Sequence, residues 1–140
     1  MPSGIGAAVS LALARAGCTR LLLADSSAEG LERTAMSCST IETRQMEILT
    51  ITCDVGDAQA VDSMVGEGVR KFGAIHYCVN CAGTMPTQRG TADISFHDFM
   101  AGAEANQRWV SRALGSDVMA WRLDKIVRSG SACVRSSAKS

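Results

Sequence analysis

The stretch GIGAAVSLALARAGCTRLLLAD, residues 4–25, decides the fold class of this chain. Its first half places small and aliphatic residues at helical spacing, and Gly17 supplies the left-handed conformation that often ends a helix. Its second half contains the apolar run 21–24, which is typical of a strand buried on both faces and ends at the acidic Asp25. A helix followed so closely by a buried strand predicts an α/β fold.

Helices and strands alternate along the rest of the chain. Ser26-x-x-Glu29 forms a capping box for a second helix, which we expect to reach about Met36 before a loop or frayed end over 37–46. The elements expected after it are a strand at 48–53, a helix between its N-cap Asp57 and its terminator Gly73, a buried strand at 75–79, a helix from the capping signal Ser95-x-x-Asp98 to about Leu114, and a short strand at 132–134. This alternation predicts one doubly wound domain over residues 1–140, with a parallel sheet and helices on both faces.

Composition argues against several classes of partner. Fourteen basic and fourteen acidic residues cancel, so the net charge gives no reason to expect nucleic acid or an anionic membrane surface. The last part of the chain is basic, and we interpret its weakly defined segment 115–140 as ordinary solvated charge. Because the apolar stretches fall far short of the roughly 18 residues that a membrane span needs, we expect a soluble, cytoplasmic protein.

Six cysteines are scattered through apolar stretches, a pattern that indicates buried thiols and not the disulfide framework of a small secreted domain. Cys78-x-x-Cys81 has the spacing of a zinc or redox motif. There is no second cysteine pair with ligand spacing, and the motif lies on an expected buried strand. A structural role is therefore favoured, and no metal site is predicted.

Doubly wound sheets bind ligands beyond the carboxyl ends of their strands. The residues that follow the expected strands are therefore the candidates for a functional site. They are Asp25, Asp54, the segment from Asn80 to Gly83, and the pair Ser136 and Ser137.

In type and order, these residues resemble the short-chain dehydrogenase/reductase family. The matching elements are Ser3-Gly4-Ile5-Gly6 at a helix start, Asp25 after the next strand, Asp54-Val55 after the following one, and Asn80-Cys81-Ala82-Gly83 after the strand beyond. A lone Gly-Ile-Gly is a weak signal, whereas four elements in family order at similar spacing are specific. The resemblance covers residues 3–114 well and 129–138 loosely. It implies an NAD(P)-dependent oxidoreductase with an incomplete Rossmann-like fold.

The resemblance implies a site for a nicotinamide dinucleotide. Glycines at the helix start let the backbone approach the pyrophosphate, where amide groups and the helix dipole favour negative charge. Asp25 would accept hydrogen bonds from the adenosine ribose and repel a 2′-phosphate, which favours NAD over NADP. Asp54 would contact the adenine amino group with Val55 against the ring, and segment 80–83 would border the other ribose. Each residue also has an ordinary interpretation as a helix start, cap or turn, and the residues alone leave that alternative open.

The family transfers hydride between nicotinamide and an alcohol or ketone, with a Tyr exchanging the proton and a Lys four residues later lowering its pKa. Asn106 lies near the place of a family Asn that holds a water in the proton relay, and Ser137 matches the serine that hydrogen-bonds the substrate carbonyl. Tyr77 is the single tyrosine and Cys81 stands four residues later, so this pair does not match the motif.

The resemblance also predicts a truncated chain that is catalytically incomplete as it stands. The family's first strand would precede Met1, and its Tyr-x-x-x-Lys would follow Ser140. In the family strand order 3-2-1-4-5, the first strand lies between the strands expected at 21–24 and 75–79, so its loss would leave two facing edges unpaired. We therefore expect either that the two halves close up in a changed register or that the chain folds poorly. The alternative is a non-catalytic nucleotide-binding or interaction module derived from the family. The substrate, an alcohol or ketone, is not identified by the residues, and a homo-oligomer is consistent with the family.

Overall fold

The computed structural model describes residues 4–41, 46–84, 93–115, 131–135 and 138–139. Its elements are α1 (Ile5–Arg15), β1 (Arg20–Asp25), α2 (Ala28–Ser39), β2 (Glu47–Thr52), α3 (Ala58–Phe72), β3 (Tyr77–Asn80), β4 (Gly83–Thr84), α4 (Phe96–Gly115), β5 (Ser131–Arg135) and β6 (Ala138–Lys139). Every helix and strand expected from the sequence is present. Of the loop or frayed helix end expected from residue 37 onwards, the start is helical, because α2 continues to Ser39.

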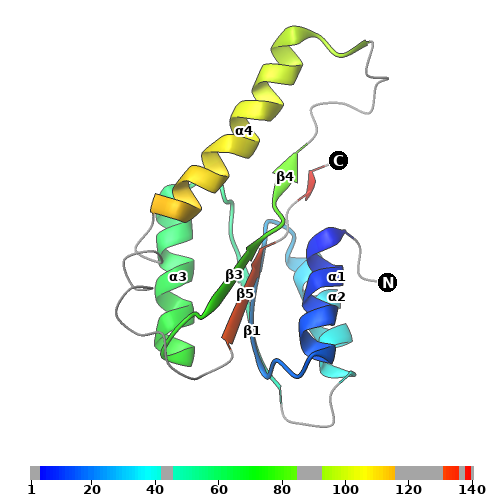
Figure 1. Ribbon diagram of the computed structural model, residues 1–140, viewed down its shortest axis with the longest axis vertical. Coiled ribbons are helices and arrows are strands. Elements are labelled where there is room, and N and C mark those ends of the chain that lie inside the picture. Colours follow the sequence, from blue (N-terminus) through cyan, green and yellow to red (C-terminus); the bar gives the residue numbers. More distant parts are fainter. Residues whose placement is uncertain (1–3, 42–45, 85–92, 116–130, 136–137, 140) are drawn as a thin grey trace.

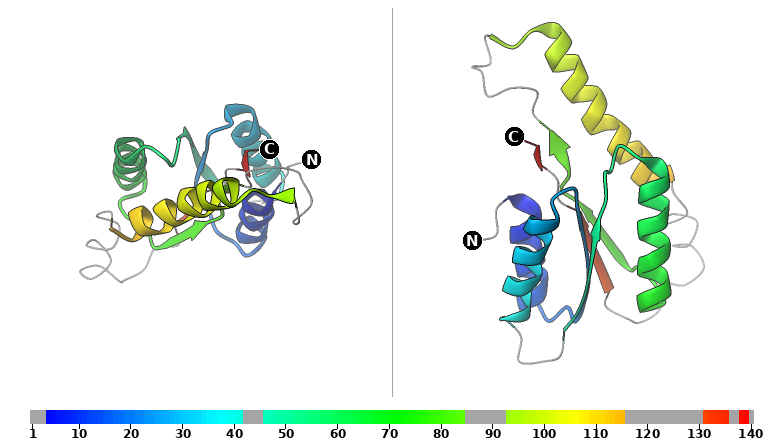
Figure 2. Two further views of the ribbon diagram at one scale, coloured as in Figure 1. Left: turned by 90° about the horizontal axis from the view of Figure 1, so that it is seen from above. Right: turned by 180° about the vertical axis from the view of Figure 1, so that it is seen from behind.

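Four parallel strands form the main sheet in the order β2-β1-β5-β3, and β4 and β6 form a separate parallel pair (Figure 1). Helices α1 and α2 lie on one side of the main sheet and α3 lies on the other, as the view from behind in Figure 2 shows. The expected doubly wound α/β arrangement is therefore confirmed.

Strand β1 divides the core into two halves. Leu21 and Leu23 belong to a buried cluster with residues of α1 and α2, whereas Leu22 and Ala24 belong to a cluster with residues of α3. Successive side chains of a strand point to opposite faces, which produces this division. All four side chains are at most 2% exposed, so the run is buried on both faces as predicted. Burial of each Leu side chain contributes roughly 1.5–3 kcal/mol.

Strand β5 occupies the position where we expected two unpaired edges. It pairs in parallel with β1 on one side and with β3 on the other. The facing edges of β1 and β3 are therefore not left unpaired, and they do not close up on each other. β5 lies between them and does not take the outer position that the family order implies for it. The physical reason is that the backbone N–H and C=O groups of two facing edges need partners, and one extended segment between them supplies both sets.

Strand β3 lies at an edge of the sheet and is not buried. Tyr77, Cys78 and Asn80 are exposed, and Tyr77 is 64% exposed. The prediction of a strand buried on both faces is wrong here. Since β3 has a neighbouring strand on one side only, its side chains have fewer neighbours than those of β1.

Helix α2 begins one residue later than the capping box in the sequence predicted. Ser27, and not Ser26, is the N-cap, and its Oγ accepts a hydrogen bond from the N–H of Gly30 at 3.1 Å. The shift follows from Asp25, whose Oδ1 accepts a hydrogen bond from the N–H of Ser27 at 2.8 Å. The other signals are confirmed: Asp57 and Ser95 accept hydrogen bonds from the first turns of α3 and α4, and Gly17 and Gly73 follow α1 and α3 with φ of 87° and 82°.

The absence of a side chain at Gly68 allows α3 to pack closely on β1. A Cβ built at Gly68 would lie 2.5 Å from Leu22 Cδ1 and 3.2 Å from Ile75 Cδ1. Leu22 is 1% exposed, so its side chain lies within the core. We predict that Gly68→Ala lowers the free energy of unfolding by roughly 1–3 kcal/mol, because it overpacks the core.

The matched control is Gly66→Ala on the same helix, where an added Cβ would meet nothing within 4 Å. The higher helix propensity of alanine should there raise the free energy of unfolding by up to about 1 kcal/mol. Denaturant titration of both variants measures the two opposite signs. A Gly68→Ala variant as stable as the original chain would contradict the close packing of α3.

Candidate functional site

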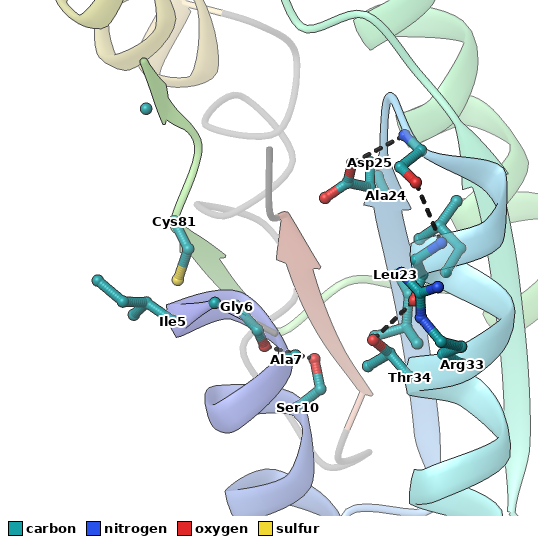
Figure 3. A pocket seen from close by; sticks show the side chains of 15 residues that line it. Ile5, Gly6, Ala7, Ser10, Leu23, Ala24, Asp25, Arg33, Thr34 and Cys81 are labelled. Carbon is teal, nitrogen blue, oxygen red and sulfur yellow. Dashed lines mark hydrogen bonds between the residues drawn. The ribbon is translucent and has the colours of Figure 1, made fainter. Parts of the chain in front are cut away.

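A cavity of about 570 Å³ lies at the start of α1 and the carboxyl end of β1 (Figure 3). Its size is within the range of about 300–1000 Å³ for ligand pockets. Its position is the one at which doubly wound sheets bind ligands. The lining residues are Gly4, Ile5, Gly6, Ala7 and Ser10 of the α1 region, Leu23, Ala24 and Asp25 of β1, Ser27, Gly30, Leu31, Arg33 and Thr34 of the α2 region, and Cys81 and Gly83 after β3.

Helix α1 begins at this cavity without a side-chain cap. Its N-cap is Gly4, whose φ of 91° and ψ of 168° are accessible almost only to glycine. Within the described part of the chain, no side chain accepts a hydrogen bond at this helix start, and the first turn holds no acidic residue. By contrast, Ser27 and Asp57 cap α2 and α3. The first N–H groups of α1 and the positive end of its dipole are therefore available to an anion in the cavity.

Small side chains form the buried face of α1. Gly6, Ala7, Ser10 and Ala14 are buried, so the helix backbone lies close to its neighbours. Ser10 Oγ donates a hydrogen bond to the carbonyl of Gly6 at 2.8 Å, which satisfies a buried hydroxyl. Ile5, at the mouth of the cavity, is 75% exposed. Because these side chains are small, the buried face of α1 leaves space beside the end of β1.

Asp25 contributes a carboxylate to the wall of the cavity. Its Oδ1 is held at the start of α2 by the N–H of Ser27, at 2.8 Å. Among the described residues, none donates a hydrogen bond to its Oδ2. One oxygen therefore fixes the orientation of the carboxylate, and the other is able to accept a hydrogen bond from a ligand.

Arg33 brings a cation to the same cavity. Its Nη1 donates to Glu29 Oε1, one turn earlier on α2. The two side chains are 48% and 79% exposed, so this ion pair contributes little to stability, about 0–1 kcal/mol. Sequence reasoning missed Arg33 because a single arginine on a helix surface forms no motif. Only the packing of α2 beside β1 shows that it lines the cavity.

The segment after β3 reaches the cavity through Cys81 and Gly83. Asn80 Oδ1 accepts a hydrogen bond from the N–H of Ala82 at 3.2 Å, and this turn carries the chain away from the strand end. A Cβ built at Gly83 would lie 3.7 Å from Asn106 Oδ1, so α4 brings Asn106 close to the segment. Burial raises the pKa of the Cys81 thiol.

The structure brings part of the predicted cofactor site together. The predicted residues that line the cavity are Gly4, Ile5, Gly6, Asp25 and Gly83. The predicted residues that do not line it are Asp54, Val55, Asn80 and Ala82. Asp54 is exposed and accepts a hydrogen bond from the N–H of Gly56 at 2.8 Å, and Val55 is buried. Ser3 and Ser137 lie outside the described residues.

In the described part of the chain, no group of three or more His, Cys, Asp or Glu side chains is arranged to hold a metal ion. None of the helices described is long and apolar enough to span a membrane.

Comparison with known proteins gives consistent matches. The sequence profile of the short chain dehydrogenase family matches residues 1–113. The short-chain dehydrogenase anuF of Penicillium roqueforti is 40% identical over 82 residues, which are 58% of this chain and 30% of that protein. Levodione reductase superposes with a TM-score of 0.68 and 32% identity, over 81% of this chain and 43% of its own.

A second solved structure, an alcohol dehydrogenase from the archaeon Thermococcus sibiricus in complex with 5-hydroxy-NADP, superposes with a TM-score of 0.62 and 26% identity. That match covers 79% of this chain and 46% of the archaeal one. The chain therefore spans less than half the length of each of these three proteins.

The raised pKa of Cys81 leads to a pH-dependent prediction. Only the thiolate reacts with an alkylating reagent, so at pH 7 Cys81 should react more slowly than the exposed Cys78. The rate at Cys81 should increase as the pH rises toward its raised pKa. Cysteines titrate over roughly pH 7 to 9. Mass spectrometry of chains treated briefly with iodoacetamide across this range measures the alkylation rates of both cysteines. Equal alkylation rates for Cys78 and Cys81 at pH 7 would show that burial does not slow the reaction of the Cys81 thiol.

Proposed function

This chain belongs to the short-chain dehydrogenase family, and from that premise we propose that it binds a nicotinamide dinucleotide and serves hydride transfer between that cofactor and a small-molecule alcohol or ketone. The observation that carries the proposal is the cavity of about 570 Å³. There, the uncapped start of α1 and the carboxylate of Asp25 face one space, although they come from different elements.

The start of α1 is suited to hold the pyrophosphate. Gly4 and Gly6 place no side chain between the backbone and a ligand, so phosphate oxygens are able to approach the N–H groups closely. The helix dipole adds about 0.3–1 kcal/mol of attraction for a nearby negative charge. When bound, the nicotinamide supplies or accepts the hydride, and the residues of this chain bind and orient the cofactor.

The preferred cofactor in this proposal is NAD. Asp25 Oδ2 is available to accept a hydrogen bond from a ribose hydroxyl, whereas a 2′-phosphate at the same place would meet a negative charge. At 4 Å, two unit charges interact with about 1 kcal/mol in water and about 4 kcal/mol at an effective dielectric constant of 20. Arg33 would favour NADP, but Glu29 already pairs with its guanidinium. The experiment must therefore distinguish the binding of NAD from the binding of NADP.

Asn106 is proposed as a positioning residue in proton transfer. Support comes from α4, which brings its Oδ1 close to Gly83 at the wall of the cavity. Ser137 is proposed to bind the substrate carbonyl.

Isothermal titration of the purified chain with NAD is the direct test, and we expect saturable binding in roughly the micromolar range (about −8 kcal/mol). Gly4→Ala should weaken binding about tenfold or more, because an alanine in this backbone conformation costs about 1–3 kcal/mol of strain or shifts the helix start.

Gly17→Ala is the matched control. Gly17 also has a positive φ, of 87°, but an added Cβ there meets nothing within 4 Å and Gly17 does not line the cavity. This variant should lose stability and keep its affinity for NAD. Equal losses of affinity in the two variants would mean that strain, and not the helix start, controls binding. A folded chain that binds no dinucleotide would refute the proposal.

Asp25→Ala tests the choice of cofactor. It should reduce the ratio of NAD to NADP affinity roughly tenfold, because it removes both a ribose acceptor and a repulsive charge. Glu29→Gln should change the ratio in the same direction by a smaller factor, because it leaves Arg33 without its ion-pair partner. Competition titrations with both dinucleotides give these ratios. An unchanged ratio in Asp25→Ala would remove the basis for preferring NAD.

A further inference from the structure

The two buried polar side chains among the described residues both line the cavity at the start of α1. Ser10 of α1 is 1% exposed, and Thr34 of α2 is 9% exposed. Figure 3 shows them on different sides of the cavity, since Ser10 belongs to one helix and Thr34 to the other. Buried hydroxyl groups need hydrogen-bond partners, so the direction of the bonds they already make determines what they offer to a ligand.

Both hydroxyl groups are able only to accept a hydrogen bond from a ligand. Ser10 Oγ donates to the carbonyl of Gly6 at 2.8 Å, and Thr34 Oγ1 donates to the carbonyl of Gly30 at 2.9 Å. A hydroxyl has a single proton and a carbonyl oxygen never donates, so each proton is used by the backbone of its own helix. Lone pairs on the two oxygens remain, and they favour a ligand group that carries N–H or O–H.

The other residues of this part of the wall are apolar, apart from one cation. Leu23 and Leu31 are buried and line the same cavity. Arg33 lines it as well, with its Nη1 bonded to Glu29. Apolar side chains and guanidinium groups both pack against the faces of aromatic rings. A flat aromatic ring with an exocyclic hydrogen-bond donor therefore matches the chemistry of the wall.

We propose that the space between α1 and α2 receives the adenine ring of the dinucleotide, and that Thr34 Oγ1 accepts a hydrogen bond from its exocyclic amino group. The inference rests on the proposed binding of a nicotinamide dinucleotide, and it identifies the residue that selects the base. Thr34 is the more accessible of the two hydroxyls, and Ser10 lies deeper in the wall. The base is bonded directly to the ribose, and the wall that begins at Asp25 continues along α2 to Thr34.

This place differs from the one that the family resemblance implies, where Asp54 would contact the amino group and Val55 would pack against the ring. Neither residue lines the cavity, and Asp54 Oδ1 already accepts a hydrogen bond from the N–H of Gly56 at 2.8 Å. Asp54 is exposed, whereas Thr34 is buried. A buried acceptor that meets no donor loses its hydration without compensation, so Thr34 should discriminate between bases more sharply than an exposed carboxylate.

Nicotinamide hypoxanthine dinucleotide is the matched probe, because its base carries a carbonyl oxygen where adenine carries the amino group. Isothermal titration of the full chain with this compound and with NAD compares two bases on the same phosphates, riboses and nicotinamide. We expect NAD to bind about tenfold more tightly, because the carbonyl would face the acceptor Thr34 Oγ1. In Thr34→Val, which keeps the shape of the side chain and removes the hydroxyl, the two affinities should agree to within about twofold.

Ser39→Ala is the matched control. Ser39 lies on the same helix and its Oγ makes the same kind of bond, to the carbonyl of Ala35 at 3.0 Å, but it is exposed and does not line the cavity. This variant should keep the preference for NAD. Asp54→Ala should keep it as well, whereas its loss in Asp54→Ala would assign the amino group to Asp54 and overturn the inference.

Equal affinities of the unsubstituted chain for the two dinucleotides would refute this inference and leave the proposed function intact. A preference for NAD that persists in a folded Thr34→Val variant would also refute it. Binding of neither dinucleotide would refute the proposed function together with the inference. Circular dichroism establishes whether each variant is folded. If Thr34→Val does not fold, the unsubstituted chain and Asp54→Ala decide the outcome.

Discussion

The burial of β1 on both of its faces is the interaction on which the rest of the structure depends. Leu21 and Leu23 pack against the layer of α1 and α2, and Leu22 packs against α3. Because a strand presents successive side chains to opposite faces, four adjacent apolar residues are enough to hold both helix layers to one sheet. The close approach of α3 at Gly68 shows how tightly one of these layers fits.

The candidate site is a consequence of where this buried strand ends. The apolar run stops at Asp25, and the chain must turn into α2 at a point where the helix layer leaves space. Three helices use side chains to satisfy their first N–H groups, whereas α1 begins with a glycine and no side-chain cap among the described residues. The uncapped start of α1 and the fixed carboxylate of Asp25 lie at the same cavity. Together they suit a ligand that carries both phosphate and hydroxyl groups.

Strand β5 completes the main sheet between β1 and β3. A central strand between β1 and β3 must supply backbone partners on both edges, and β5 does so although its sequence, Ser131 to Arg135, is far less apolar than the run in β1.

The sequence by itself determined the alternation of helices and strands, most of the helix ends and the family, because periodicity, capping residues and strand-end motifs are local signals. It predicted five residues of the cavity wall, including Gly4 and Asp25, for the same reason. Only the tertiary structure decided that β5 is central, that β3 is exposed, and that Arg33 and Cys81 share a cavity with α1. The order of the strands and the set of elements that line one cavity depend on contacts between residues far apart in the chain. No short stretch of sequence contains the free energy of such contacts.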